Sequence, residues 1–317
     1  MIELVDKLTK GEFRALSKAI SLIENEHPGA EELLRKIYKF TGKAYRIGVT
    51  GPPGAGKSTL VSQLAKLLRK EGNKIGIIAV DPTSPFTGGS LLGDRVRMSD
   101  LTLDEGVFIR SMATRGSLGG LSKKAIEAGD ILDAGGFDYI IFETVGVGQS
   151  ELDIVKAADT VVVVLVPESG DSIQAMKAGL MEIADIFVLN KSDREGADVA
   201  VNAIKSVLSF RQRRDEWEIE VVKTIASTGA GVDVLLEVIK KHRNFLIKTG
   251  EFERRRKEKL KLKIKEIVEE KLRENLWTFD RERLLDEKVS SITNSHLNPI
   301  EIAEELIKHF YRQNSLQ

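Results

Sequence analysis

Residues 51–58 read Gly-Pro-Pro-Gly-Ala-Gly-Lys-Ser and match G-x-x-x-x-G-K-[ST], the pattern of a phosphate-binding loop. They follow an apolar run and precede a segment of helical period, which is the context that this loop requires. Glycines let backbone N–H groups turn toward an anion, and the helix N-terminus adds partial positive charge. Lys57 can neutralise the β- and γ-phosphates, and Ser58 can offer its hydroxyl to Mg²⁺. We expect nucleotide contacts from Gly51, Pro52, Pro53, Gly54, Ala55, Gly56, Lys57, Ser58 and Thr59.

Three acidic residues are candidates for the metal. Asp81 ends one apolar run, Asp94 lies in a following stretch rich in Gly, Ser, Thr and Pro, and Glu143 ends the run DYIIFE. An apolar strand that ends in a carboxylate is typical of the Walker B acid, which acts on Mg²⁺ directly or through water. An Asp after a strand is also common as a helix cap or turn residue, so both interpretations stay open for Asp81 and Asp94. The predicted metal set is Ser58, Asp81, Asp94 and Glu143.

The turn after Glu143 is predicted to respond to the γ-phosphate. Thr144-Val145-Gly146 follows the acid directly, and Gly146 can place a backbone N–H near that phosphate, the group that leaves on hydrolysis. Gln149 lies three residues beyond Gly146 rather than beside it. The sequence therefore does not assign Gln149 a role in orienting a water molecule.

Residues 190–193, Asn-Lys-Ser-Asp, form the pattern N-K-x-D at the end of a late apolar run. The carboxylate of Asp193 can accept hydrogen bonds from N1–H and the 2-amino group of guanine, whereas adenine would leave it unpaired. Lys191 has a stem long enough to cover the base, and Asn190 can brace neighbouring loops. A later turn, Ala226, Ser227 and Thr228, is placed to offer a backbone N–H to guanine O6. The sequence therefore predicts GTP and GDP as ligands, in preference to ATP.

The elements that must position these residues alternate along the chain. Short apolar runs such as RIGVT, KIGIIAV, DYIIFE, TVVVVLV and DIFVLN are separated by segments of helical period. This alternation is typical of a mainly parallel sheet flanked by helices, the α/β fold of P-loop NTPases. Helical extensions are expected on both sides of it. The predicted division is an N-terminal helical extension at 1–43, a nucleotide-binding domain at 44–247 and a C-terminal helical region at 248–317.

The C-terminal region begins with a highly charged segment in which Leu260, Ile264, Ile267, Val268 and Leu272 recur at helical spacing. A helix with one apolar stripe is expected. It either packs back on its own domain or forms an arm that meets a second subunit, and the pattern does not choose between these.

Composition excludes several classes of protein. The 317 residues carry 48 basic and 48 acidic groups, so the excess positive charge of a general nucleic-acid binder is missing. No cysteine is present, which excludes disulfides and thiol catalysis, and four histidines argue against a dense metal cluster. Neither a signal peptide nor a membrane span is recognisable at the N-terminus, so a cytoplasmic protein without membrane partners is expected.

Taken together, these segments resemble the MeaB/ArgK G proteins associated with cobalamin-dependent methylmalonyl-CoA mutase, in the SIMIBI class of P-loop GTPases. The resemblance covers nearly the whole chain and rests on residues 51–59, 80–98, 142–151, 166–179 and 190–193. It implies a third segment, SGDSIQAMKAG, in which Asp171, Gln174 and Lys177 couple nucleotide state to a partner. It also implies a homodimer formed through the C-terminal helices, and GTP-dependent protection, loading or repair of the adenosylcobalamin-dependent acyl-CoA mutase. The implied catalytic set is Lys57, Ser58, Asp94, Glu143, Gln174 and Lys177.

Two other functions stay open. One is an ATP-dependent kinase or ATPase of a lysine, arginine and ornithine transport system, which the guanine-reading carboxylate of Asp193 argues against. The other is a GTPase for nickel insertion, for which the few histidines and the lack of cysteine give little support.

Overall fold

The structure is a computed structural model that describes residues 1–81, 98–113, 123–144, 146, 150–168, 179–209, 217–291 and 298–314. Within these residues the chain builds one seven-stranded sheet whose paired strands are all parallel, in the order β3-β2-β4-β1-β5-β6-β7. The strands are β1 (Tyr45–Thr50), β2 (Ile75–Asp81), β3 (Val107–Ala113), β4 (Tyr139–Glu143), β5 (Thr160–Leu165), β6 (Ile186–Asn190) and β7 (Glu220–Thr224).

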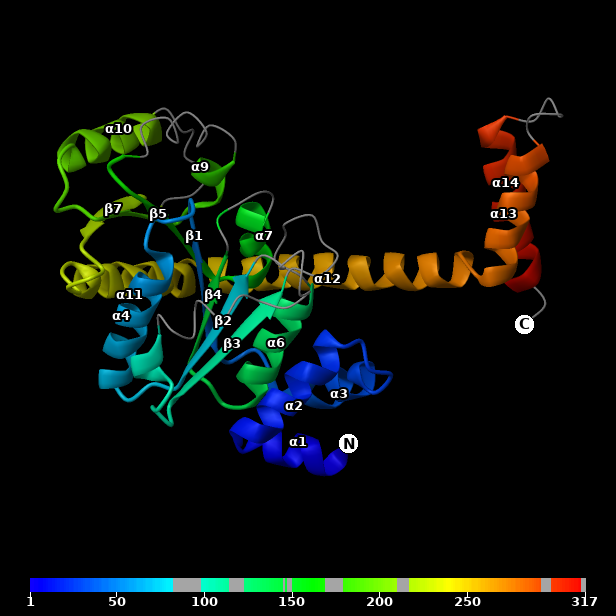
Figure 1. The fold of residues 1–317 in the computed structure, drawn as a ribbon, viewed down its shortest axis with the longest axis horizontal. Coiled ribbons are helices and arrows are strands. Elements are labelled where there is room, and N and C mark those ends of the chain that lie inside the picture. The colour runs from blue at the N-terminus through cyan, green and yellow to red at the C-terminus, as the bar shows by residue number, and fades with distance from the viewer. Residues whose placement is uncertain are drawn as a thin grey trace. The chain divides into compact units, whose positions relative to one another are not determined.

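Helices cover both faces of the sheet, so most strands are apolar on both sides. One face packs against α4 (Lys57–Lys70) and α11 (Val232–Thr249). The other packs against α6 (Lys123–Ala134), α7 (Ser150–Ala157), α9 (Leu180–Ile183) and α10 (Ala197–Ser209). Every residue of β5 is buried, which explains its continuous apolar run. Figure 1 shows this layered arrangement. The predicted fold class, a P-loop NTPase with a parallel sheet between helices, is confirmed.

The starting ends of the strands are fixed by aspartates that directly precede β4, β5 and β6. Asp138 accepts a hydrogen bond from the Lys74 N–H (2.7 Å), Asp159 from the Arg46 N–H (3.0 Å) and Asp185 from the Val161 N–H (2.8 Å). In each case the donor stands opposite the aspartate when the strand register is extended by one residue. A slip of one residue would break these bonds and turn apolar side chains out of the core, so the aspartates specify the register.

The N-terminal helices share the core of the sheet domain. They are α1 (Ile2–Thr9), α2 (Phe13–Glu24), α3 (Ala30–Ile37) and the short 3₁₀ turn η1 (Tyr38–Phe40). The rings of Phe13 and of Phe108 on β3 form a T-shaped pair, with centroids 5.4 Å apart. Arg110, also on β3, hydrogen-bonds Glu24 and the Ser21 hydroxyl. The chain then enters β1 through residues 42–44, whose three N–H groups all donate to the buried Asp133 carboxylate.

Residues 253–317 form a second compact unit, separate from the unit of residues 1–252. Most of α12 (Glu251–Leu276) belongs to it, followed by α13 (Phe279–Ser291) and α14 (Pro299–Asn314). Arg281 on α13 is buried, donates to the Leu276 carbonyl (2.6 Å) and lies over the Phe310 ring of α14. The Asn298 side chain caps α14 by accepting the N–H groups of residues 300 and 301. None of the described helices is long and apolar enough to cross a membrane.

Candidate functional site

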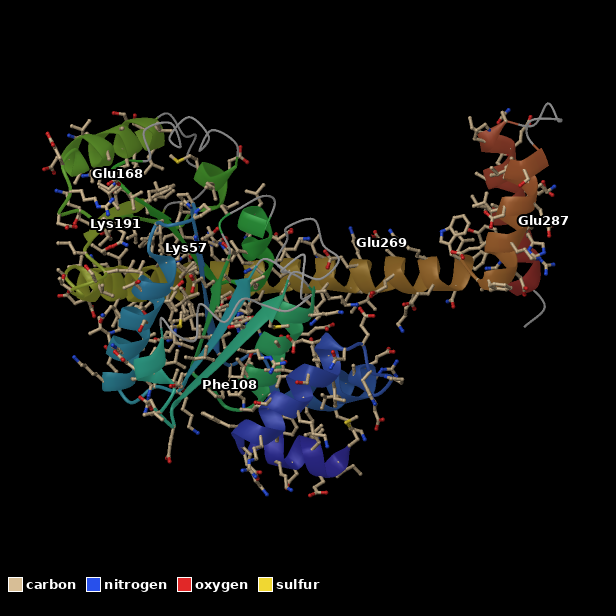
Figure 2. The ribbon with its side chains drawn as sticks, viewed as in Figure 1. Lys57, Phe108, Glu168, Lys191, Glu269 and Glu287 are labelled. Atoms are coloured by element: carbon tan, nitrogen blue, oxygen red, sulfur yellow. The ribbon has the colours of Figure 1, made fainter. Side chains whose placement is uncertain are left out.

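The phosphate loop, residues 51–56, leaves the carboxyl end of β1 and leads into α4. β1 lies between β4 and β5; the connection from β1 leads to β2 on one side, and the connection from β4 leads to β5 on the other. Ligands of open α/β sheets bind at such a switch point, beyond the carboxyl ends of the strands. The loop requires glycine where it meets its neighbours: Gly56 has φ +88°, and a Cβ there would lie 2.4 Å from the Asn190 side-chain nitrogen. Figure 2 shows Lys57 and Lys191 at this end of the sheet.

Lys57 and Ser58 begin α4 and are both buried. The Lys57 ammonium donates to the carbonyl oxygens of Gly51 (2.8 Å) and Pro52 (3.0 Å), so the charge is held against the loop. The Ser58 hydroxyl donates to Oε1 of Glu143 at the end of β4, 2.6 Å away. A hydroxyl and a carboxylate that are 85 positions apart in the sequence thus meet at one point. The other predicted loop residues, Pro52, Pro53, Gly54, Ala55 and Thr59, lie in the same loop and the first turn of α4.

The turn after β4 lies directly against the phosphate loop. The Thr144 hydroxyl donates to the Thr50 hydroxyl at the end of β1 (2.8 Å), and both side chains are buried. Gly146 has φ +88°, and a Cβ built there would lie 2.1 Å from the Gly51 carbonyl oxygen and 2.6 Å from the Lys57 nitrogen. Only glycine allows this approach. A movement of residue 146 toward the loop would therefore displace the Lys57 ammonium.

Asn190, at the end of β6, joins three segments through its side chain. Its Nδ2 donates to the Ala55 carbonyl of the phosphate loop (2.8 Å), and its Oδ1 accepts from the Thr224 hydroxyl (3.1 Å) and the Ala226 N–H (2.9 Å). The residue is 2% exposed. The bracing expected from the sequence is thus present, and it connects the phosphate loop with the turn after β7.

Lys191 and Asp193 follow on the turn after β6. Lys191 has φ +56°, which is uncommon for a residue other than glycine, and its ammonium donates to the Gly54 carbonyl (2.8 Å). Its stem therefore extends toward the phosphate loop. Asp193 is exposed. Arg194 hydrogen-bonds Glu168 in the turn after β5, and this bond holds the pKa of the Glu168 carboxyl below its usual value.

In the turn after β7, most backbone donors of residues 226–229 are used within the protein. The N–H groups of Ala226, Thr228 and Gly229 donate to Asn190 and to the Ile225 carbonyl. The Ser227 N–H has no hydrogen-bond partner among the described residues, and the Ser227 residue is exposed. Of the three residues predicted to contact guanine O6, Ser227 is the one whose backbone donor is available.

Several predicted residues fall outside the described part of the chain. Asp94, Asp171, Gln174 and Lys177 belong to this group, as does Gln149. The backbone of Asp81 ends β2, and its side chain is not among those described.

Two contacts of the site were not predicted from the sequence. One is the pair of Thr50 and Thr144, which depends on the register of β1 and β4. The other is the ion pair of Glu168 and Arg194, which joins the turns after β5 and β6. Neither has a sequence signal of its own, because each depends on which strands are neighbours.

A phosphate loop with an adjoining Walker B acid, on a parallel sheet with an N-K-x-D turn braced against that loop, defines a P-loop GTPase. Residues 16–281 match the family described as methylmalonyl-CoA mutase-associated GTPase MeaB, and the chain belongs to this family.

Individual relatives agree with this assignment. The chain is 50% identical over 309 residues to a Pyrococcus horikoshii protein that is named a GTPase, covering 95% of this chain and 96% of that one. It is 33% identical to the mouse methylmalonic aciduria type A homolog, mitochondrial, covering 96% and 78% of the two chains. The crystal structure of a LAO/AO transport system kinase superposes with a TM-score of 0.74 at 30% identity, covering 98% and 97%.

The contact of Gly146 with the phosphate loop gives a testable expectation. Gly146→Ala should lower GTP turnover about 100-fold, because the new methyl group would displace Gly51 and Lys57 from their positions. Gly136→Ala is the matched control: its φ is +79°, but nothing lies within 4 Å of the added carbon, so it introduces only backbone strain. Steady-state phosphate release measures both. Turnover at the parent rate in Gly146→Ala would contradict the proposed contact.

Proposed function

We propose that this GTPase is a guanine-nucleotide-dependent chaperone of an adenosylcobalamin-dependent acyl-CoA mutase, most simply methylmalonyl-CoA mutase. The observation that carries the proposal is the joining of the base turn to the phosphate loop through Asn190, in a chain whose family is described by its association with that mutase. Asn190 and Lys191 both bind phosphate-loop carbonyls. A base bound at the N-K-S-D turn would therefore act on the phosphate loop through these bonds.

Within this proposal, the residues fit a Mg²⁺ ion. Ser58 and Glu143 present a hydroxyl and a carboxylate oxygen 2.6 Å apart, and hard oxygen ligands of this kind suit Mg²⁺. Both would hold the ion, with Asp81 and Asp94 as the further candidates from the sequence. The ion would neutralise charge on the phosphates. Lys57 orients and neutralises the phosphate chain, while Gly146 and the buried Thr50–Thr144 pair keep the turn after β4 against the loop.

The base site is proposed to read guanine through two groups. The exposed Asp193 carboxylate would accept N1–H and the 2-amino group, and the Ser227 N–H would donate to O6. A transport-system kinase, the function in the name of the structural relative, would use ATP. Adenine would leave the Asp193 carboxylate without a hydrogen-bond partner. This arrangement therefore favours the GTPase over an ATP-dependent kinase.

A second copy of the chain is the proposed partner of α12. This helix buries none of its residues, and Leu260, Ile264, Val268 and Leu272 repeat every four positions along one side with 39–53% of their surface exposed. A stripe of large exposed apolar side chains is typical of a protein interface. Together with the family resemblance, it supports a homodimer formed through residues 248–317.

Guanine selectivity can be tested by one substitution. Asp193→Asn should weaken GDP binding about 100-fold or more, because the two charge-assisted bonds to guanine are lost. The same variant should gain affinity for xanthosine diphosphate, whose 2-oxo group can accept from the new amide. Calorimetric titration of the parent and the variant with both nucleotides measures the exchange. Equal affinity of the parent protein for ATP and GTP would contradict the assignment of the base site.

The chaperone role can be tested by turnover. Purified methylmalonyl-CoA mutase should raise GTP hydrolysis by about tenfold or more, because partner-ordered groups complete the site in other GTPases. Gln174 and Lys177 are the sequence candidates for these groups. Lys57→Ala controls for contaminating GTPases, since it should stay inactive with and without the mutase. No change in turnover, together with no co-purification in the presence of a GTP analogue, would refute the proposed partner.

The homodimer can be tested on α12 itself. Ile264→Glu combined with Val268→Glu should convert the dimer to monomer, because both charges would be buried in the interface. Lys259→Glu combined with Arg273→Glu is the matched control, since helical geometry places these residues on the opposite side. Light scattering after size-exclusion chromatography gives the masses. A dimer that survives the first pair of substitutions would place the interface elsewhere.

A further inference from the structure

Ser111, on the edge strand β3, is a polar residue that the GTPase motifs do not explain. Its hydroxyl oxygen is buried and has no hydrogen-bond partner in the described structure. Leaving a buried hydroxyl unsatisfied carries a desolvation penalty, so such a group calls for an explanation, and a bound water or ion is one.

The register places Ser111 in one row with the Walker B acid. Ala79 of β2 pairs with Ser111 on one side and with Glu143 of β4 on the other. Paired residues of neighbouring parallel strands project to the same face of a sheet. The three side chains therefore form a row of hydroxyl, methyl and carboxylate across β3, β2 and β4.

This row lies on the α4 face of the sheet, immediately beyond the apolar core. Val107, Ile77 and Ile141 pack into the cluster beneath α4, and Ile109 packs against its side. The next positions toward the carboxyl ends of the strands, two residues on from Ile109, Ile77 and Ile141, are Ser111, Ala79 and Glu143. In this layer Ser111 and Glu143 carry the first polar groups above the core. Since Glu143 in this layer also accepts from Ser58 at the start of α4, the layer borders the phosphate site.

Ala79 stands at the centre of the row and is fully buried. Its side chain is a single methyl group, so the two polar groups are not separated by a bulky residue. Adjacent strands are about 4.8 Å apart, which puts the backbones of Ser111 and Glu143 about 10 Å from each other. An oxygen ligand of a metal held at Ser58 and Glu143 would have to bridge this separation.

We propose that Ser111 is a positioning residue of the GTPase: its hydroxyl hydrogen-bonds an oxygen ligand of the Mg²⁺ ion bound near Ser58 and Glu143. The inference rests on the metal site in the proposed function. Mg²⁺ retains several of its waters in proteins, and the groups that hydrogen-bond its ligands orient them. Ser111 would thus orient the oxygen ligand that lies on the side of the site facing β2 and β3.

The test is the Mg²⁺ dependence of release of a fluorescent GDP analogue. Ser111→Ala should raise the Mg²⁺ concentration that half-slows release about tenfold, the lower end of the effect of outer ligand partners. Release in EDTA should stay at the parent rate, and Ser111→Thr, which keeps the hydroxyl, should restore Mg²⁺ dependence. The nucleotide-free Ser111→Ala protein should unfold at or above the parent temperature, because it loses only an unsatisfied group.

Ser58→Ala separates the two levels of the proposal. If Ser58→Ala weakens Mg²⁺ dependence and Ser111→Ala does not, the role of Ser111 is refuted while the metal site stands. If neither substitution changes it, the metal site is refuted and the inference falls with it. A lower unfolding temperature of nucleotide-free Ser111→Ala with unchanged Mg²⁺ dependence would show a structural role only.

Discussion

The site depends on how the carbonyl oxygens of the phosphate loop are satisfied. A loop that presents N–H groups to an anion leaves its carbonyls to find other donors. Lys57 donates to the carbonyls of Gly51 and Pro52, Lys191 to that of Gly54, and Asn190 to that of Ala55. Two of these three side chains belong to the N-K-S-D turn. The guanine motif is therefore also a structural support of the phosphate motif.

The turn after β4 is arranged differently, because its described residue Gly146 lies in close backbone contact with the loop. Gly146 approaches the Gly51 carbonyl and the Lys57 ammonium so closely that any side chain would collide. The Thr50–Thr144 hydroxyl pair fixes the base of the turn, while the Gly146 backbone lies at the phosphate end. A turn that is anchored at one end and contacts the loop at the other is suited to change position when the phosphates bound by the loop change. This is a physical basis for the nucleotide-sensing role that the sequence suggested.

Much of this arrangement follows from local sequence, and the remainder depends on tertiary structure. The apolar runs predicted the strands, because strands buried on both faces cannot alternate, and the glycine pattern predicted the loop between β1 and α4. Glu143 could be named because a carboxylate that ends a strand is itself a signal. Ser111 could not, because one serine in a strand becomes informative only when the register places it beside Ala79 and Glu143. The exposure of the α12 stripe was left open for the same reason, since spacing alone does not show what covers a helix.

The positions of the ligand-facing side chains are also set at the opposite end of the sheet. Asp138, Asp159 and Asp185 each bind the N–H of the residue opposite, where β4, β5 and β6 begin. Parallel strands have no tight turns to fix their register, so an offset at the start would be carried to the carboxyl end. A one-residue slip of β4 would move Glu143 about 3.3 Å along the strand and turn it to the other face, away from Ser58. The aspartates that no nucleotide contacts are thus a condition for the 2.6 Å approach of Ser58 and Glu143.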